Sequence, residues 1–299
     1  MSQINVDIIE NLSGTPGDNT PVRVNGAKIY GIGIGMRSLS IGDNQKAISP
    51  GYGINADAVH IGTSVFPPAS GFNAQTVAIG SLIADLNANN GCGQSVLIGT
   101  EVARNIGNSS SDNVFIGYKS GESLTGLNDN NVIIGSQSGK LITSGNQNAL
   151  YGAFAGSTLT SGGNNVCIGS NSNTATATTS NSITLGNSSH TVLRCAVTSI
   201  TSLSDARDKT NVEESTYGLD LVNSLRPVTF EWDTRDGAKK GVKDLGFIAQ
   251  DLKELDDEYL GLVYDENPEK LEASYGKLIP VLVKAIQELS EEVKQLKSK

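Results

Sequence analysis

Apolar positions recur at a nearly constant interval along the first two hundred residues. An aliphatic residue or tyrosine precedes each glycine of a series whose gaps are 20, 18, 19, 18, 18, 17, 17 and 17 residues: Gly42, Gly62, Gly80, Gly99, Gly117, Gly135, Gly152, Gly169 and Gly186. Most units carry another apolar residue two positions earlier, as in Asn113-Val114-Phe115-Ile116-Gly117. Period-2 spacing places Val114 and Ile116 on one face of a short strand, and the glycine permits a sharp turn. We therefore predict a mainly β shaft of stacked repeats over residues 31–200.

A repeat of this size cannot bury its apolar face alone, so neighbouring units must stack. The linkers between strands, such as residues 144–148 and 161–165, are rich in Gly, Asn and Ser and suit turns. A single thin ribbon would leave one side open. Three chains, each giving one face to every layer, would close that side and hide the strand edges. We expect a homotrimeric, β-roll-like or β-prism-like shaft.

The opening residues, 1–30, have no helical period. Ile4, Val6 and Ile8 alternate, and a turn is indicated at residues 14–17. Two interpretations stay open, an extended arm that docks onto a larger assembly and a frayed terminus.

The chain changes character at Ser204. Residues 1–204 hold 8 basic and 10 acidic side chains, whereas residues 205–299 hold 14 and 21. Helical spacing over residues 217–225 stops at Pro227, and residues 228–232 and 244–249 read as a hairpin whose turn includes Asp236-Gly237 and Lys240-Gly241. We predict a small α+β domain over residues 201–299.

The last helix carries a heptad seam. Its apolar positions are spaced 4, 3, 4, 3, 4 and 3 residues apart: Tyr275, Ile279, Leu282, Ile286, Leu289, Val293 and Leu296. Such a seam indicates a coiled coil and agrees with the expected trimer, although heptads alone do not fix the number of strands. Pro280 lies near the helix start or kinks the helix.

The boundary itself holds candidate chemistry. Ser204 precedes Lys209 by five residues in Ser204-Asp205-Ala206-Arg207-Asp208-Lys209. A serine nucleophile needs a nearby base, and a lysine amine serves once it is deprotonated. Taken alone, this spacing is also that of an exposed polar turn.

Several motifs in order make the last domain resemble the C-terminal intramolecular chaperone of phage endosialidases and tail fibres, a self-cleaving serine peptidase. They are the hexapeptide Ser204–Lys209, the segment from Leu225 to Phe230, the run 245–251 and the helix from Tyr275. The repeats resemble shafts of trimeric phage fibres and, more loosely, head repeats of trimeric bacterial adhesins.

The resemblance implies a fibre or spike on a virion, made in the host cytoplasm. Its last domain would trimerise the chains and then cut between Ser204 and Asp205, once per chain. Ser204 would be the nucleophile and Lys209 the general base, while Arg207 and Asp205 would hold the loop. Attack of Ser204 Oγ on its own carbonyl closes a four-membered ring, whereas attack on the Leu203 carbonyl closes a five-membered ring. A neighbouring chain or an activated water is therefore left open as the attacking group.

The composition of the chain restricts the kinds of partner that we expect it to bind. A net charge of −9 disfavours nucleic acid, and no apolar run approaches the ~20 residues that span a bilayer. We expect virion proteins to bind the arm and a host receptor, in one version a glycan, to bind the shaft. We expect no cofactor or metal, because His60 and His190 have no partner at metal spacing and Cys92, Cys167 and Cys195 suit free thiols. An ion held by three identical histidines on a trimer axis stays open as an alternative.

Two alternatives remain. A trimeric bacterial adhesin would need a secretion signal and a membrane anchor. A glycan-degrading spike would need paired carboxylates, whereas the candidates are scattered: Asp43, Asp57, Asp85, Glu101, Asp112, Glu122 and Asp129.

Overall fold

The computed structural model describes residues 22–24, 27–30, 38–41, 58–65, 76–84, 92–106, 110–126, 128–196 and 200–299. The chain divides into two compact units, Met1–Asn187 and Ser188–Lys299, each described by itself. Most of the expected N-terminal arm and the carboxylates Asp43, Asp57 and Asp85 lie outside the described residues.

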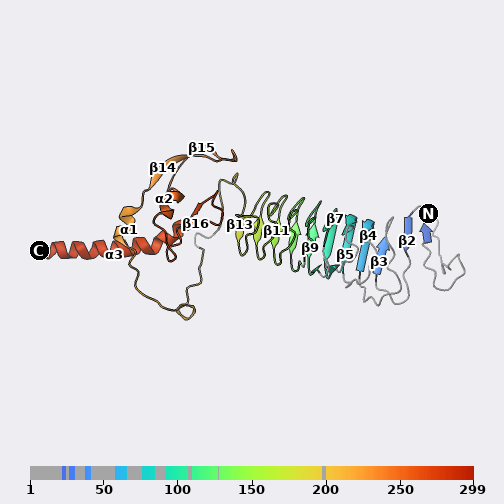
Figure 1. The fold of residues 1–299 in the computed structure, drawn as a ribbon, viewed down its shortest axis with the longest axis horizontal. Helices are drawn as coiled ribbons and strands as arrows, with labels where there is room; N and C mark the ends of the chain where they lie inside the picture. Colours follow the sequence, from blue (N-terminus) through green and yellow to red (C-terminus); the bar gives the residue numbers. More distant parts are fainter. Residues whose placement is uncertain are drawn as a thin grey trace. The chain divides into compact units, whose positions relative to one another are not determined.

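The first unit is a β-solenoid, which confirms the predicted stack of repeats (Figure 1). Within the described residues, eleven strands form one sheet in the order β1-β2-β3-β4-β5-β7-β9-β10-β11-β12-β13. The first three strands pair antiparallel, and every pairing from β3 to β13 is parallel. The bounds are β1 Val22–Val24, β2 Ala27–Tyr30, β3 Ser38–Ile41, β4 Ala58–Val65, β5 Val77–Ile83, β7 Val96–Thr100, β9 Val114–Ile116, β10 Val132–Ile134, β11 Ala149–Tyr151, β12 Val166–Ile168 and β13 Ile183–Leu185. Two short strands, β6 Cys92–Gly93 and β8 Ser110–Ser111, pair separately.

The central residue of each short strand points into the solenoid. In register, this column reads Ala78, Leu97, Phe115, Ile133, Leu150, Cys167 and Thr184. All but Thr184 are fully buried. The residues on either side, such as Val114 and Ile116, share one face as expected, but that face is the outer one. Each chain therefore fills its own core, and the expected ribbon with one open side is wrong.

Left-handed corners let so short a repeat close on itself. The residue two positions after the repeat glycine has φ between 55° and 59° in five successive rungs: Glu101, Lys119, Gln137, Phe154 and Asn171. Non-glycine residues rarely adopt this conformation. The repeat glycine is itself at a close approach, because a Cβ on Gly135 would lie 2.3 Å from the carbonyl oxygen of Gly152.

A ladder of buried asparagines precedes the strands. Asn131 Nδ2 donates to Gly145 O at 2.9 Å, and Asn131 Oδ1 accepts from Asn148 N at 3.0 Å. Asn148 repeats the pattern toward Gly162 and Asn165. These amides satisfy the backbone groups of the rung corners, which buried polar groups require.

The second unit is a small α+β fold. Its elements are the 3-10 helix η1 Ala206–Asp208, α1 Leu219–Ser224, β14 Val228–Asp233, β15 Lys240–Gly246, α2 Ala249–Lys253, β16 Val263–Tyr264, β17 Glu272–Ala273, the 3-10 helix η2 Tyr275–Lys277 and α3 Leu278–Lys297. β14 and β15 form the predicted hairpin, with Asp236-Gly237 in its turn. Lys240-Gly241 lies in β15, so its assignment to the turn was wrong.

A compact cluster joins α2, the segment 260–263 and the start of α3. Its buried members are Leu252, Leu260, Leu262, Leu278 and Val281. A carboxylate oxygen of Glu288 on α3 accepts from Leu219 N at 2.7 Å and thereby caps α1. Pro280 is the third residue of α3, where its missing N–H removes no helical hydrogen bond.

The seam of α3 has no cover in the single chain. Its six helical members are between 44% and 69% exposed: Ile279, Leu282, Ile286, Leu289, Val293 and Leu296. Tyr275 precedes the helix, and its hydroxyl accepts from Phe247 N at 3.2 Å. The seam therefore begins at Ile279.

Candidate functional site

The candidate nucleophile lies on an exposed strap, residues 200–216, that precedes α1. All residues of this strap are exposed, and Leu203 retains 99% of its accessible surface. The regular element here is η1, a single turn. Asp205 begins this turn as its N-cap, and its Oδ1 accepts from Arg207 N at 2.9 Å. Aspartate favours this position because its side chain satisfies a free N–H of the first turn.

The turn brings Lys209 back onto Ser204. Lys209 N donates to Ala206 O at 3.3 Å, which ends the turn. Lys209 Nζ then lies 2.7 Å from Ser204 Oγ and 3.4 Å from the Ser204 carbonyl oxygen. The first distance suits proton transfer between the hydroxyl and the amine. The second places the same amine beside the carbonyl of the Ser204–Asp205 bond.

The Arg207 guanidinium pairs with the Asp205 carboxylate within the same turn. Its Nε donates to Asp205 Oδ1 at 3.0 Å, and Nη2 donates to Oδ2 at 2.6 Å. The Arg207 guanidinium holds the pKa of Asp205 below its usual value, and the backbone bond from Arg207 acts in the same direction. Since both side chains are largely exposed, the pair orients the loop more than it stabilises the fold. The geometry is compatible with the loop-holding role expected of Arg207 and Asp205, which stays a prediction.

Enclosure is what the site lacks as a peptidase centre. Amines and hydroxyls in bulk water are solvated, and electrostatic help to a developing oxyanion is weak at high dielectric. The Ser204–Lys209 pair therefore has the contact needed for chemistry but not the enclosure. A peptidase centre at this pair would need a further surface to cover it.

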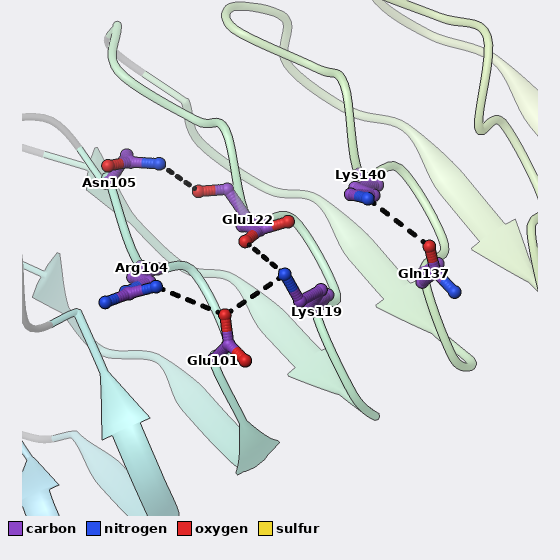
Figure 2. A network of polar contacts seen from close by, with 7 residues as sticks. All are labelled: Glu101, Arg104, Asn105, Lys119, Glu122, Gln137 and Lys140. Carbon is purple, nitrogen blue, oxygen red and sulfur yellow. Dashed lines mark hydrogen bonds and ion pairs between the residues drawn. The ribbon is translucent and has the colours of Figure 1, made fainter.

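A second cluster of charges lies on the solenoid (Figure 2). Lys119 Nζ lies 3.1 Å from Glu101 and 2.9 Å from Glu122, and Arg104 reaches Glu101 at 3.2 Å. The hydrogen bonds that Lys119 donates to Glu122 and then to Glu101 raise its pKa. The bond from Lys119 lowers the pKa of Glu101. This network could not be predicted from the spacing of the repeat. It forms because the left-handed corners align Glu101 with Lys119 on successive rungs.

This network argues against glycan cleavage at these residues. A glycosidase needs one carboxyl group whose pKa is raised, so that it donates a proton. Glu101 is shifted in the opposite direction. Asp129 accepts from Ser111 N at 2.8 Å and thus serves a turn.

The remaining candidates are His190, the cysteines Cys167 and Cys195, and His60 and Cys92, of which the last two are placed by their strands alone. His190 is exposed, Cys167 is buried and free, and Cys195 is exposed and free. His60 lies in β4 and Cys92 begins β6. Among the described residues, no three His, Cys, Asp or Glu side chains gather as metal ligands. In the same part of the chain, no helix has both the length and the apolar character to cross a membrane.

Comparison with known families places this loop at the start of a recognised domain. Residues 204–261 match the family model described as Peptidase_S74, chaperone of endosialidase. The match begins at Ser204 and includes the hairpin and α2, which confirms the resemblance drawn from the sequence. Among curated proteins and among solved structures, no match is found.

Proposed function

We propose that this chain is a virion fibre or spike whose last domain assembles three copies and then cuts itself free. The observation that carries the proposal is the 2.7 Å contact between Lys209 Nζ and Ser204 Oγ, at the first residue of the segment matching the endosialidase chaperone. The solenoid would be the lasting part, and residues 205–299 the removable part. Attachment through the N-terminal arm and binding of a host receptor are further elements of the proposal and rest on the sequence alone.

The cut would add one water across the Ser204–Asp205 peptide bond. The Ser204 carbonyl carbon gains an oxygen and becomes a carboxylate, and the Asp205 nitrogen leaves as a new α-amine. Lys209, in its unprotonated form, takes the proton from the attacking oxygen and returns it to that nitrogen. The attacking oxygen belongs to Ser204 of a neighbouring copy or to a water, since Ser204 Oγ cannot close a four-membered ring on its own carbonyl. If the neighbouring Ser204 attacks, the ester that it forms with the Ser204 carbonyl carbon is then hydrolysed by a water, which gives the carboxylate and restores the hydroxyl.

The exposed seam of α3 supports assembly of copies. β-branched residues occupy one heptad position (Ile279, Ile286, Val293), and leucines occupy the other (Leu282, Leu289, Leu296). Six apolar side chains on one helix face are costly to leave in water, at roughly 1.5–3 kcal/mol for each one fully buried. In parallel coiled coils this choice of residues favours two strands. The number three is therefore proposed for the whole chain and does not follow from the seam.

Autoproteolysis is tested by substituting Ser204. Purified wild-type chain should run as two fragments, residues 1–204 and 205–299, on a denaturing gel, and Ser204→Ala should run as one intact chain. Ser202→Ala is the matched control, since Ser202 lies on the same exposed strap. An intact wild type, or a Ser204→Ala chain cut as completely as wild type, would overturn the assignment. Intact mass spectrometry of the two fragments locates the bond.

A further inference from the structure

The outer face of the solenoid sheet is apolar from β4 to β13. Two columns flank the buried one and stay in register from β4 to β13. One column contains Val59, Val77, Val96, Val114, Val132, Ala149, Val166 and Ile183, and the other contains Ile61, Ile79, Ile98, Ile116, Ile134, Tyr151, Ile168 and Leu185. None of these side chains is charged.

These columns are not part of the core of their own chain. The core is filled by the column between them, from Ala78 to Cys167. The outer side chains stay partly in water, and their exposure reaches 46% at Ile168 and 73% at Ile183. Eight rungs about 4.8 Å apart and three residues about 3.3 Å long give a face on the order of 300 Å². The largest apolar patch on a typical monomer covers about 300–600 Å² and is often functional.

The other sides of the same rungs are mixed. The corners after β7 and β9 carry the Lys119 network, the return loops expose Thr143, Ser144 and Asn164, and single apolar side chains such as Tyr118 and Leu141 are exposed between them. The strand face differs from these sides because its two columns are apolar in every rung from β4 to β13. A charged partner would gain nothing on the strand face, because that face offers no charge to pair.

The spacing of the rungs restricts which surfaces can pack against this face. Side chains on the face repeat every rung, and a surface that interdigitates with all of them must repeat at the same interval. We propose that the partner is the same outer face of further copies of this chain, packed parallel and with equivalent rungs level. This inference rests on the proposed assembly of copies and assigns the surface that they share along the solenoid.

The C-terminal helix is compatible with the same arrangement. Its exposed heptad seam suits copies that run parallel, which is also the orientation that keeps equivalent rungs level. The face is smaller than the ~800 Å² that each partner of a standard stable complex buries. The helix therefore has to hold the copies together before the faces engage.

Cysteine cross-linking tests the contact. Ile134→Cys places a thiol in the outer column at β10, and Ser144→Cys, a near-isosteric exposed change in the loop after β10, is the control. Both are made in the full chain with Cys195→Ser, which removes the exposed native thiol. The chains are oxidised with copper phenanthroline and run on a non-reducing denaturing gel. Ile134→Cys should give a covalent dimer that reducing agent removes, and Ser144→Cys should stay at the background level of Cys195→Ser alone.

The result is read with the native mass from light scattering. If the chain is an oligomer that cuts itself but Ile134→Cys forms no dimer, or Ser144→Cys forms as much, the shared face is wrong while the proposed function stands. If the wild-type chain has the native mass of a monomer, both the shared face and the proposed function are wrong. A second variant, Val166→Cys, should form a covalent dimer as Ile134→Cys does. When Ile134→Cys chains are mixed with Val166→Cys chains, fewer cross-links should join position 134 of one chain to position 166 of another than join two equivalent positions. Equal cross-linking of unlike positions would overturn the level packing.

Discussion

At the scale of single residues, the Ser204–Lys209 contact is the product of one turn. Asp205 caps it, Arg207 holds Asp205, and the chain returns so that the amine meets the hydroxyl. Nothing larger than six residues is needed to form the pair, which explains why the hexapeptide could be singled out from the sequence. Its exposure could not be predicted in the same way, because exposure depends on what packs over the strap.

The pairing of Glu101 with Lys119 gives a test by pH. The pKa of Glu101 is lowered in the folded chain, so its contribution to stability is present above the ordinary glutamate pKa of about 4.3 and is lost as pH falls through the lower folded value. Glu101→Gln should therefore lower the thermal midpoint of the solenoid at pH 7, and the difference from wild type should shrink in acid below pH ~4.

Circular dichroism of both chains across this range measures the difference. Glu213→Gln, on the exposed strap of the other unit, should match wild type throughout. A gap between Glu101→Gln and wild type that stays constant down to acid would show that the carboxylate charge does not contribute.

At the scale of elements, the stacked strands could be predicted from the sequence, because their glycines recur at nearly equal intervals. Equal gaps and period-2 apolar residues were enough to predict short stacked strands. They could not reveal which side faces inward, because Val114, Phe115 and Ile116 are all apolar and both faces of the strand satisfy the pattern. The closure of each rung depends on left-handed residues such as Lys119 and Phe154, and side chains of this kind carry no preference for that conformation. The buried role of Asn131 was hidden for a related reason, since asparagine also suits exposed turns.

The close approach at the repeat glycine predicts a severe effect of substitution. Gly135 has φ 139°, and a Cβ there would meet the Gly152 carbonyl oxygen at 2.3 Å, a backbone atom that cannot rotate away. Gly135→Ala should cost ~3 kcal/mol or more, since it adds steric overlap to backbone strain. The expected result is loss of folded solenoid or a large fall in its denaturation midpoint.

Gly276→Ala is the control for that change, because a Cβ at Gly276 meets nothing within 4 Å. Its midpoint should stay near that of wild type. If Gly135→Ala unfolded at the same denaturant concentration as Gly276→Ala, the close backbone approach at the repeat glycine would not be required for the rung.

At the scale of the whole molecule, two apolar surfaces are left uncovered for different reasons. In the proposed assembly, the narrow and regular α3 seam would bring copies together through local contacts, which form quickly. The solenoid face is small, so it would engage only between copies that the helix already holds at high effective concentration. The helix could then be removed, because faces packed over many rungs would separate slowly.

Disrupting the seam separates these two contributions. Leu289→Asp places a charge at the centre of the exposed seam, whereas Gln287→Asp places the same charge two residues away on the flank. Leu289→Asp should give a chain of monomeric mass by light scattering, with the circular dichroism of an intact solenoid, because each chain fills its own core. It should also remain uncut, since the exposed Ser204–Lys209 pair then lacks the neighbouring copy that encloses it. Gln287→Asp should assemble and cut as wild type does. A monomeric Leu289→Asp chain that still cuts at the wild-type rate would show that the strap completes its site alone, and the link between assembly and cleavage would have to be abandoned.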